Sequence, residues 1–361
     1  SLDAKTGLPD PDFGTQGRVD LAEDLSRPVN RYRYGISSPP TVIGNVVVIG
    51  STILDWHSGD SPEKYTSPGD VKGYDVRSGK LLWTFHTIPQ PGEFGHEEWQ
   101  NNPWESFGAA NVWATMSADP ESGLIYLPVA AVSHDRYGGE RPGSNLFSDS
   151  IVALDARTGE RIWHYQLVHH TLWNYDPPAP PMLLDVMIDG RPRKILVQIT
   201  KQAMAFVFDR ITGEPIWPIE EQQVPASKVP GEQAWPTQPF PTKPAPFDRQ
   251  GLTKADLIDF TPALHEEALE IISEYDYGPL YTPPSLRGTI QMPGELGGGD
   301  WVGASADVNS GVIFVPSKTL PDVTVLTAID DTNAVSAYGG KRRLLRGPQG
   351  LPLTKPPYGR I

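Results

Sequence analysis

The sequence predicts an all-β fold in which similar sheets repeat around a ring. A pattern of Asp, two residues, Ser or Thr, Gly, three residues and Trp occurs at residues 75–83, 155–163 and 209–217. Each copy follows a short apolar stretch, so we expect a strand, a tight turn and a second strand. The 361 residues include 35 Gly and 38 Pro, which suits short strands and many turns better than helices. A hairpin repeated at intervals of tens of residues is typical of a β-propeller.

Each conserved position of the repeat has a place in this hairpin. The aspartate, Asp75 in the first copy, can accept hydrogen bonds from the backbone of its own turn. The glycine, Gly79, can adopt the positive φ that such a turn requires. The tryptophan, Trp83, is expected to dock between neighbouring units. A fourth, degenerate copy begins at Asp3 and has Pro11 in place of the tryptophan.

The other strands follow from apolar runs between turn residues. Residues 39–50 are expected to form a strand, a Gly-Asn turn and a buried strand. We see no domain boundary, so residues 1–361 are expected to form a single partial propeller domain of about five four-stranded sheets. Further strands are expected at residues 71–74, 111–117, 124–129, 151–154, 194–200, 203–208 and 312–316.

The second half of the chain is less regular, with an excursion and a short helix expected within residues 215–280. Residues 215–250 are crowded with proline but contain aromatic residues, which indicates an ordered surface excursion. Thr253 can cap a short helix, and residues 262–275 carry the apolar stripe of a longer one. The tail after residue 338 is expected to be a loop.

Composition argues against several classes of function. The formal net charge is −14 and the pI is about 5.0, which disfavours nucleic acid or an anionic membrane surface as a partner. The chain has no cysteine, no ligand spacing of a zinc site, no glycine-rich phosphate loop and no Gly-x-Ser-x-Gly elbow. No apolar stretch approaches the roughly 18 residues that span a bilayer. The chain opens inside a repeat, so we expect a fragment whose targeting segments lie outside it.

Seven segments carry a resemblance to a known family. They are residues 38–41, 69–83, 124–128, 169–173, 200–210, 281–285 and 351–359. Together they resemble the quinoprotein dehydrogenases, eight-bladed propellers that carry pyrroloquinoline quinone (PQQ). The resemblance runs along nearly the whole chain and is strongest toward the glucose- and quinate-dehydrogenase-like branch. It implies oxidation of an alcohol or sugar hydroxyl by hydride transfer to the quinone, with a divalent metal polarising the reactive carbonyl.

The resemblance assigns two residues to the quinone itself. Trp113 matches the tryptophan that stacks on the PQQ ring, and an indole face provides a stacking surface. Taken from the residues alone, a core tryptophan of a strand is the better interpretation. Lys201 matches the lysine that binds the quinone oxygens in the sugar-oxidising branch. It lies between two apolar strands, where a buried ammonium needs a partner; the alternative is a strand-end lysine that reaches solvent.

The same resemblance implies a metal site with oxygen ligands, for calcium or another divalent or lanthanide ion. Asp55 lies where the family has a carboxylate that contacts metal and cofactor, and Ser133 lies where a hydroxyl or amide ligand falls. The position after Asp55 is often Asn in the family but is Trp56 here. A turn residue of a loop is the alternative role for Asp55.

Residues 169–176 hold the main departure from the family. In relatives the residue after the tryptophan of this segment is the aspartate that acts as general base, but here it is Asn174, and an amide is no useful base near neutral pH. Asp176 matches a second acidic position that can help to bind the metal. Three hypotheses follow: Asp176 has taken over as base, Asn174 orients substrate while another group takes the proton, or the enzyme is inactive. For His169 and His170 we favour a structural hydrogen-bonding role over metal ligation.

Two hypotheses for function remain. The first is a PQQ- and metal-dependent dehydrogenase of alcohols or sugars that passes electrons to a quinone or cytochrome. The resemblance implies a periplasmic or extracytoplasmic setting and leaves open membrane association through segments outside this chain. The second is a non-catalytic propeller that binds proteins. Trp113 and Lys201 in register with Asp55 favour the enzyme. By the same resemblance Trp301 matches a late tryptophan near the mouth of the funnel and is expected to belong to the cofactor site, although it could equally be a core residue.

Overall fold

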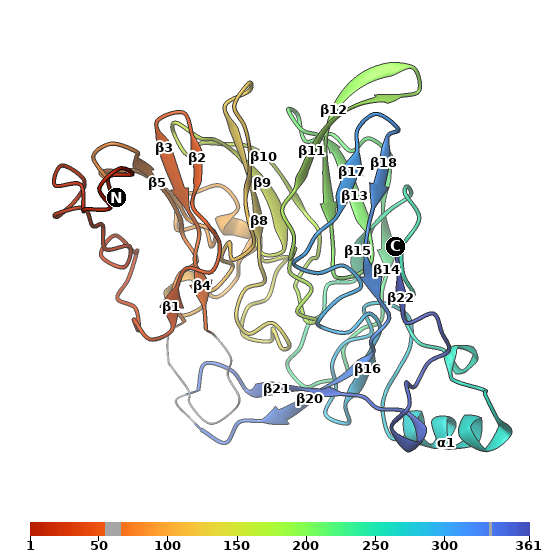
Figure 1. The fold of residues 1–361 in the computed structure, drawn as a ribbon. Coiled ribbons are helices and arrows are strands. Elements are labelled where there is room, and N and C mark those ends of the chain that lie inside the picture. Colours follow the sequence, from red (N-terminus) through yellow and green to blue (C-terminus); the bar gives the residue numbers. More distant parts are fainter. Residues whose placement is uncertain (55–65, 332–333) are drawn as a thin grey trace.

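The computed structural model describes residues 1–54, 66–331 and 334–361. Successive antiparallel sheets stand side by side, from β2, β3 and β5 near the N-terminus to β17 and β18 near the C-terminus (Figure 1). The sheet β16-β20-β21 and helix α1 lie across the lower ends of these sheets in the same view. The arrangement is that of β-propeller blades, as the sequence predicts.

The elements are short, as expected for a chain rich in turn residues. The helix is α1 (Pro262–Ser273), and four 3-10 turns are formed by His96–Glu98, Pro103–Glu105, Lys254–Asp256 and Pro348–Gly350. The strands are β1 (Tyr34–Gly35), β2 (Thr41–Ile43), β3 (Val46–Ile49), β4 (Thr52–Ile53), β5 (Val71–Asp75), β6 (Leu81–Phe85), β7 (Ser117–Asp119), β8 (Leu124–Val129), β9 (Ser150–Asp155), β10 (Arg161–Gln166), β11 (Met182–Ile188), β12 (Arg191–Ile199), β13 (Ala205–Asp209), β14 (Ile219–Gln223), β15 (Thr237–Pro241), β16 (Thr289–Gln291), β17 (Ser305–Asp307), β18 (Val312–Phe314), β19 (Ser317–Lys318), β20 (Asp322–Ala328), β21 (Tyr338–Leu344) and β22 (Gly359–Arg360).

The repeats build the first three sheets. Strands β2-β3-β5-β6 form one four-stranded sheet, β10-β9-β8-β7 form the next, and β11-β12-β13 form a three-stranded sheet. In the first copy, the Asp75 carboxylate accepts from the backbone N–H of Ser78 at 2.7 Å and of Arg77 at 3.1 Å, while Gly79 has φ +70°. The turn chemistry expected from the sequence is therefore present.

The tryptophans of the first two repeats dock on the turn of the following repeat. The Trp83 indole N–H donates to the carbonyl of Ala156 at 3.0 Å, and its ring lies over Gly159. The Trp163 indole N–H donates to the carbonyl of Arg210 at 3.1 Å, and its ring lies over Gly213. Because Trp83 and Trp163 also belong to the apolar clusters between consecutive sheets, the repeat specifies how the sheets pack as well as how each turn forms.

Several predicted elements were right and others were wrong. The helix predicted at residues 262–275 is present and ends at Ser273, and Thr253 caps the 3-10 turn that follows it. Residues 111–116 are not a strand, because their backbone bonds to several separate segments instead of one neighbour. The tail after 338 is not a loop: β21 pairs with β20 along its whole length. The proline-rich excursion contains a two-stranded sheet, β14-β15, that the sequence did not suggest.

The β16-β20-β21 sheet and its neighbouring loop contact the loop that follows β8. The Arg136 guanidinium makes two bonds of 2.7 Å to the buried carboxylate of Glu295, and the rings of Tyr137 and Tyr338 meet edge to face at 4.9 Å. A side chain at Gly340 would collide with Arg136, so glycine is needed there. Among the described residues, no helix is both long enough and apolar enough to cross a bilayer.

Candidate functional site

A cavity of about 280 Å³ lies where several of the expected site residues meet. Its walls come from β4, the irregular segment before β7, the loop after β8, the segment after β10 and the turn between β12 and β13. The residues that line it are Thr52, Ile53, Leu54, Ala109, Asn111, Trp113, Ala130, Ala131, Asp135, Asn174, Asp176 and Lys201. Three charged groups, two carboxylates and one ammonium, therefore face a small space that also has one indole.

Trp113 and Lys201 are joined through a single carboxylate. The Trp113 indole N–H donates to Oδ2 of Asp176 at 2.7 Å, and the Lys201 ammonium donates to Oδ1 of the same residue at 3.2 Å. Asp176 and Lys201 are only 6% and 5% exposed, whereas the Trp113 side chain is half-buried. The two residues that the sequence assigned to the quinone thus lie on the same cavity, with Asp176 between them.

Local backbone contacts place these side chains. The segment around Trp113 is held on two sides, since the N–H of Ala110 donates to Ala131 at 2.9 Å and the N–H of Ser51 donates to Val112 at 3.1 Å. Lys201 lies in the turn after β12, where the N–H of Gly298 donates to the Lys201 carbonyl at 2.8 Å. A Cβ at Gly297 would lie 2.7 Å from Lys201 Cγ, so the glycine run at 297–299 is what allows this close contact.

Asn174 lies beside Lys201 and contacts a carboxylate that sequence reasoning missed. Lys201 Nζ donates to both the backbone oxygen and the side-chain oxygen of Asn174, each at 2.8 Å. The Asn174 side-chain amide donates to Asp135. Burial raises the pKa of Asp135, but the Arg136 charge, the Asn174 hydrogen bond and the Lys201 charge outweigh it, so this pKa lies below its ordinary value. Asp135 could not be recognised from the sequence, because it lies between a His and an Arg in a segment that resembles a surface loop.

A second layer of ionisable groups lies behind the cavity. Asp149 is fully buried, and this burial, together with the nearby charge of Asp176, raises the pKa of its carboxyl to about 8. Its Oδ2 accepts from the Ser148 hydroxyl at 2.7 Å. Arg141, also fully buried, donates to the carbonyl of His134 at 2.9 Å and to that of Thr171 at 2.6 Å.

The remaining expected site residues are placed differently. Ser133 is fully buried, and its hydroxyl both donates to and accepts from the backbone of Gly108 at 3.3 Å. Trp301 is 57% exposed in the turn before β17, and neither it nor Ser133 is among the residues that line the cavity. Asp55 and Trp56 lie outside the described residues. Within the described ranges, no three His, Asp or Glu side chains are grouped as a ready-made metal site.

The histidine pair anchors the proline-rich excursion. The ring of His169 contacts Glu221 at 3.1 Å, and its backbone N–H donates to the side chain of Gln238 at 2.9 Å. The ring of His170 contacts Glu232 at 2.8 Å and the carbonyl of Gly143 at 2.9 Å. These contacts agree with the structural role that we expected for the pair.

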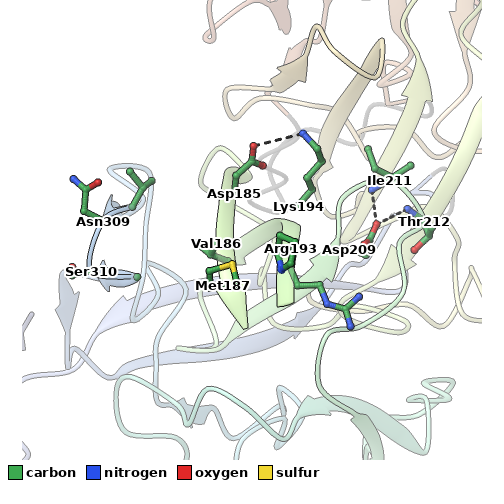
Figure 2. Close-up of a pocket in the computed structure, with 13 residues that line it drawn as sticks. Asp185, Val186, Met187, Arg193, Lys194, Asp209, Ile211, Thr212, Asn309 and Ser310 are labelled. Atoms are coloured by element: carbon green, nitrogen blue, oxygen red, sulfur yellow. Dashed lines mark hydrogen bonds and ion pairs between the residues drawn. The ribbon is translucent and has the colours of Figure 1, made fainter. Parts of the chain in front are cut away.

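A larger groove of about 770 Å³ lies between the β11-β12 hairpin and the β17-β18 hairpin (Figure 2). Its charged residues are already paired with separate partners: Lys194 lies 2.7 Å from Glu121 and 3.6 Å from Asp185, and Asp209 accepts from the N–H groups of Ile211 and Thr212 in its own turn. Because these pairs are separate from one another, the groove does not gather polar groups around a common point, unlike the cavity at Asp176.

Comparison with protein families decides the assignment. The family model described as "PQQ: Glucose/ethanol/alcohol dehydrogenase, beta-propeller domain" matches residues 1–361. The chain belongs to this family. The match covers the full sequence, so it includes every segment that carried the resemblance.

Named relatives in this family are quinoprotein dehydrogenases. The quinate/shikimate dehydrogenase (quinone) of Acinetobacter baylyi is 31% identical, over 99% of this chain and 44% of the relative. The quinoprotein glucose dehydrogenase A of Acinetobacter calcoaceticus is 32% identical, over 100% of this chain and 47% of the relative. The chain thus spans about half the length of these curated relatives.

Solved structures support the fold. The quinohemoprotein alcohol dehydrogenase ADHIIG of Pseudomonas putida superposes with a TM-score of 0.62, at 23% identity, over 95% of this chain and 44% of that structure. At this identity the similarity supports the propeller architecture alone.

Proposed function

We propose that this chain supplies the cofactor site of a PQQ- and metal-dependent dehydrogenase that oxidises an alcohol or sugar hydroxyl. One observation carries the proposal: Trp113 and Lys201 line the same cavity and share the carboxylate of Asp176. A propeller that only binds proteins has no need for a buried ammonium beside a half-buried indole in one cavity. The family membership supports the same conclusion.

The residues around the cavity suit this cofactor. Trp113 offers a flat aromatic surface, and Lys201 offers an ammonium that can donate to quinone oxygens. Asp176, with Asp55 and Ser133, would provide oxygen ligands for calcium or a similar ion; Ser133 would have to release Gly108 to do so. When bound, the quinone accepts the hydride and the metal polarises its reactive carbonyl.

The proton of the substrate hydroxyl needs a different acceptor from the one in relatives. Asn174 cannot take it, because a neutral amide is not a base near neutral pH. We assign Asn174 to hydrogen bonding with the substrate hydroxyl and Asp176 to the proton, since the Asp176 carboxylate lines the same cavity. We further propose that electrons pass on to a quinone or cytochrome and that the protein works outside the cytoplasm, as the family resemblance implies.

Reconstitution tests this proposal. The natural polypeptide that carries this chain would be purified without cofactor, titrated with PQQ in calcium-containing buffer, and assayed for dye-linked oxidation of a panel of alcohols and sugars. We expect saturable quenching of tryptophan fluorescence and turnover of at least one substrate. Trp113→Ala is expected to weaken PQQ binding by about tenfold or more, equivalent to about 1.4 kcal/mol.

Trp301→Ala is the matched control, because Trp301 is 57% exposed and does not line the cavity. Equal losses in both tryptophan variants, or no PQQ binding by the natural protein, would contradict the proposed site. Binding without turnover would identify an inactive member of the family.

A further inference from the structure

The side chain of Asn174 is held at both ends by groups of fixed hydrogen-bonding character. Its amide nitrogen donates to Asp135, and its oxygen accepts from the Lys201 ammonium at 2.8 Å. A carboxylate can only accept and an ammonium can only donate, so the Asn174 amide has one orientation that satisfies both. An asparagine side chain can donate to Asp135 and accept from Lys201 at the same time, whereas an ionised Asp has no donor and a Lys has no acceptor.

The backbone at Asn174 adds to this arrangement. Asn174 has φ +56°, a left-handed conformation that asparagine tolerates better than most residues. This conformation turns its carbonyl toward Lys201, which donates to it at 2.8 Å. Both oxygens of Asn174 therefore face the same ammonium, and only the amide nitrogen points toward Asp135.

Asp135 is itself fixed from the other side. Arg136 lies 3.5 Å from the Asp135 carboxylate and makes two 2.7 Å bonds to Glu295, which is 5% exposed. The chain of contacts thus runs from the β16-β20-β21 sheet through Glu295, Arg136 and Asp135 to Asn174 and Lys201. These contacts hold the Asp135 carboxylate toward position 174.

An aspartate at position 174 would meet this fixed carboxylate. Two carboxylates at this distance offer no donor to each other and repel when both are ionised. The family resemblance places an aspartate at this position in relatives, so Asn174 taken alone suggests a lost function. Beside the Asp135 carboxylate, however, an asparagine can donate a hydrogen bond that an aspartate cannot.

We propose that Asp135 is a positioning residue: it orients the Asn174 amide so that both Asn174 oxygens hold Lys201 at the cavity, and Asp135 and Asn174 act as a matched pair. The effect on the cofactor depends on the proposed function, but the coupling between the two side chains does not. On this proposal, the asparagine at position 174 is matched to Asp135 and is more than the loss of a catalytic aspartate.

A double-mutant cycle tests the pair with Asp135→Asn, Asn174→Asp and the exchange variant that carries both changes. The exchange variant keeps one amide facing one carboxylate. Thermal unfolding without cofactor and the affinity for PQQ in calcium buffer would be measured for each protein. Asn101→Asp is the matched control, because Asn101 is exposed and also left-handed, with φ +66°.

We expect Asn174→Asp to lower the Tm by about 2–4 °C and to weaken PQQ binding by about tenfold, and Asn101→Asp to change neither. The exchange variant should recover more than half of both losses, since interacting positions are not additive. Losses that simply add in the exchange variant would overturn the proposal. If the natural protein binds no PQQ, the proposed function fails, and the Tm arm alone decides whether the pair exists.

Discussion

Because the Trp163 ring packs on Gly213 of the following repeat, Gly213→Ala should destabilise the protein. Gly213 has φ +76°, and a Cβ there would lie 2.6 Å from the ring of Trp163. Gly123 provides the matched control, since it has φ +74° but nothing within 4 Å of its Cβ position. The two substitutions therefore impose the same backbone strain and differ in whether they collide with a docked indole.

The expected costs follow from these geometries. A left-handed backbone costs a residue with a Cβ about 1–2 kcal/mol, and overpacking a filled site adds about 1–3 kcal/mol. We expect Gly123→Ala to lower the free energy of unfolding by about 1–2 kcal/mol and Gly213→Ala by about 2–5 kcal/mol. Urea unfolding with a common m-value measures both.

The collision with the Trp163 ring can be separated from the backbone strain by making Gly213→Ala in a protein that lacks this ring. In Trp163→Ala protein, which should itself lose about 3–5 kcal/mol, the ring that Gly213→Ala would strike is gone. The additional cost of Gly213→Ala should then fall to that of Gly123→Ala. Equal costs of the two glycine substitutions in the natural protein would refute the docking account.

Three further outcomes are expected. Asp149→Asn should gain stability relative to the natural protein as the pH rises from about 4 to about 8, because the folded natural protein holds the Asp149 proton up to a pKa of about 8 while the unfolded chain releases it near 3.8. The difference should level off above about pH 8, and a Tm difference that stays constant from about pH 4 to about pH 8 would contradict this. Lys201→Met should cost about 3 kcal/mol because it leaves the buried carboxylate of Asp176 without its cation. Lys194→Met removes an exposed ion pair with Glu121 and should cost much less; calorimetry compares the two variants, and equal costs would count against a buried ion pair. Glu232→Gln should speed proteolysis within residues 215–250, because the Glu232 carboxylate accepts from the N–H of Gly138 at 2.6 Å and contacts the ring of His170 at 2.8 Å. An unchanged rate of cleavage would argue against a role of Glu232 in holding this segment.

The repeated hairpins could be predicted because their determinants are local. Asp75 and Gly79 act within one turn, and Trp83 docks on the next copy of the same pattern. The strand at residues 338–344 could not be predicted in the same way. It contains glycines and a run of cationic residues, which resemble a loop, whereas in the fold it pairs with β20 and its Gly340 lies against Arg136, a residue distant in the sequence.

The candidate site shows the same division. Trp113 and Lys201 were found by family resemblance and do share a cavity, yet the strand expected around Trp113 is absent because its backbone is divided among several partners. Asp135 was missed, since its importance comes from contacts with Asn174 and, through Arg136, with a sheet more than a hundred residues later in the sequence. A short pattern cannot reveal such a contact.

A crystal structure of the protein soaked with PQQ and calcium would test the central claim most directly. We expect electron density for a planar group inside the cavity, against the indole of Trp113 and with its oxygens at hydrogen-bonding distance from Lys201 Nζ. Density confined to the groove between the β11-β12 and β17-β18 hairpins, or an empty cavity at saturating PQQ, would contradict the assignment.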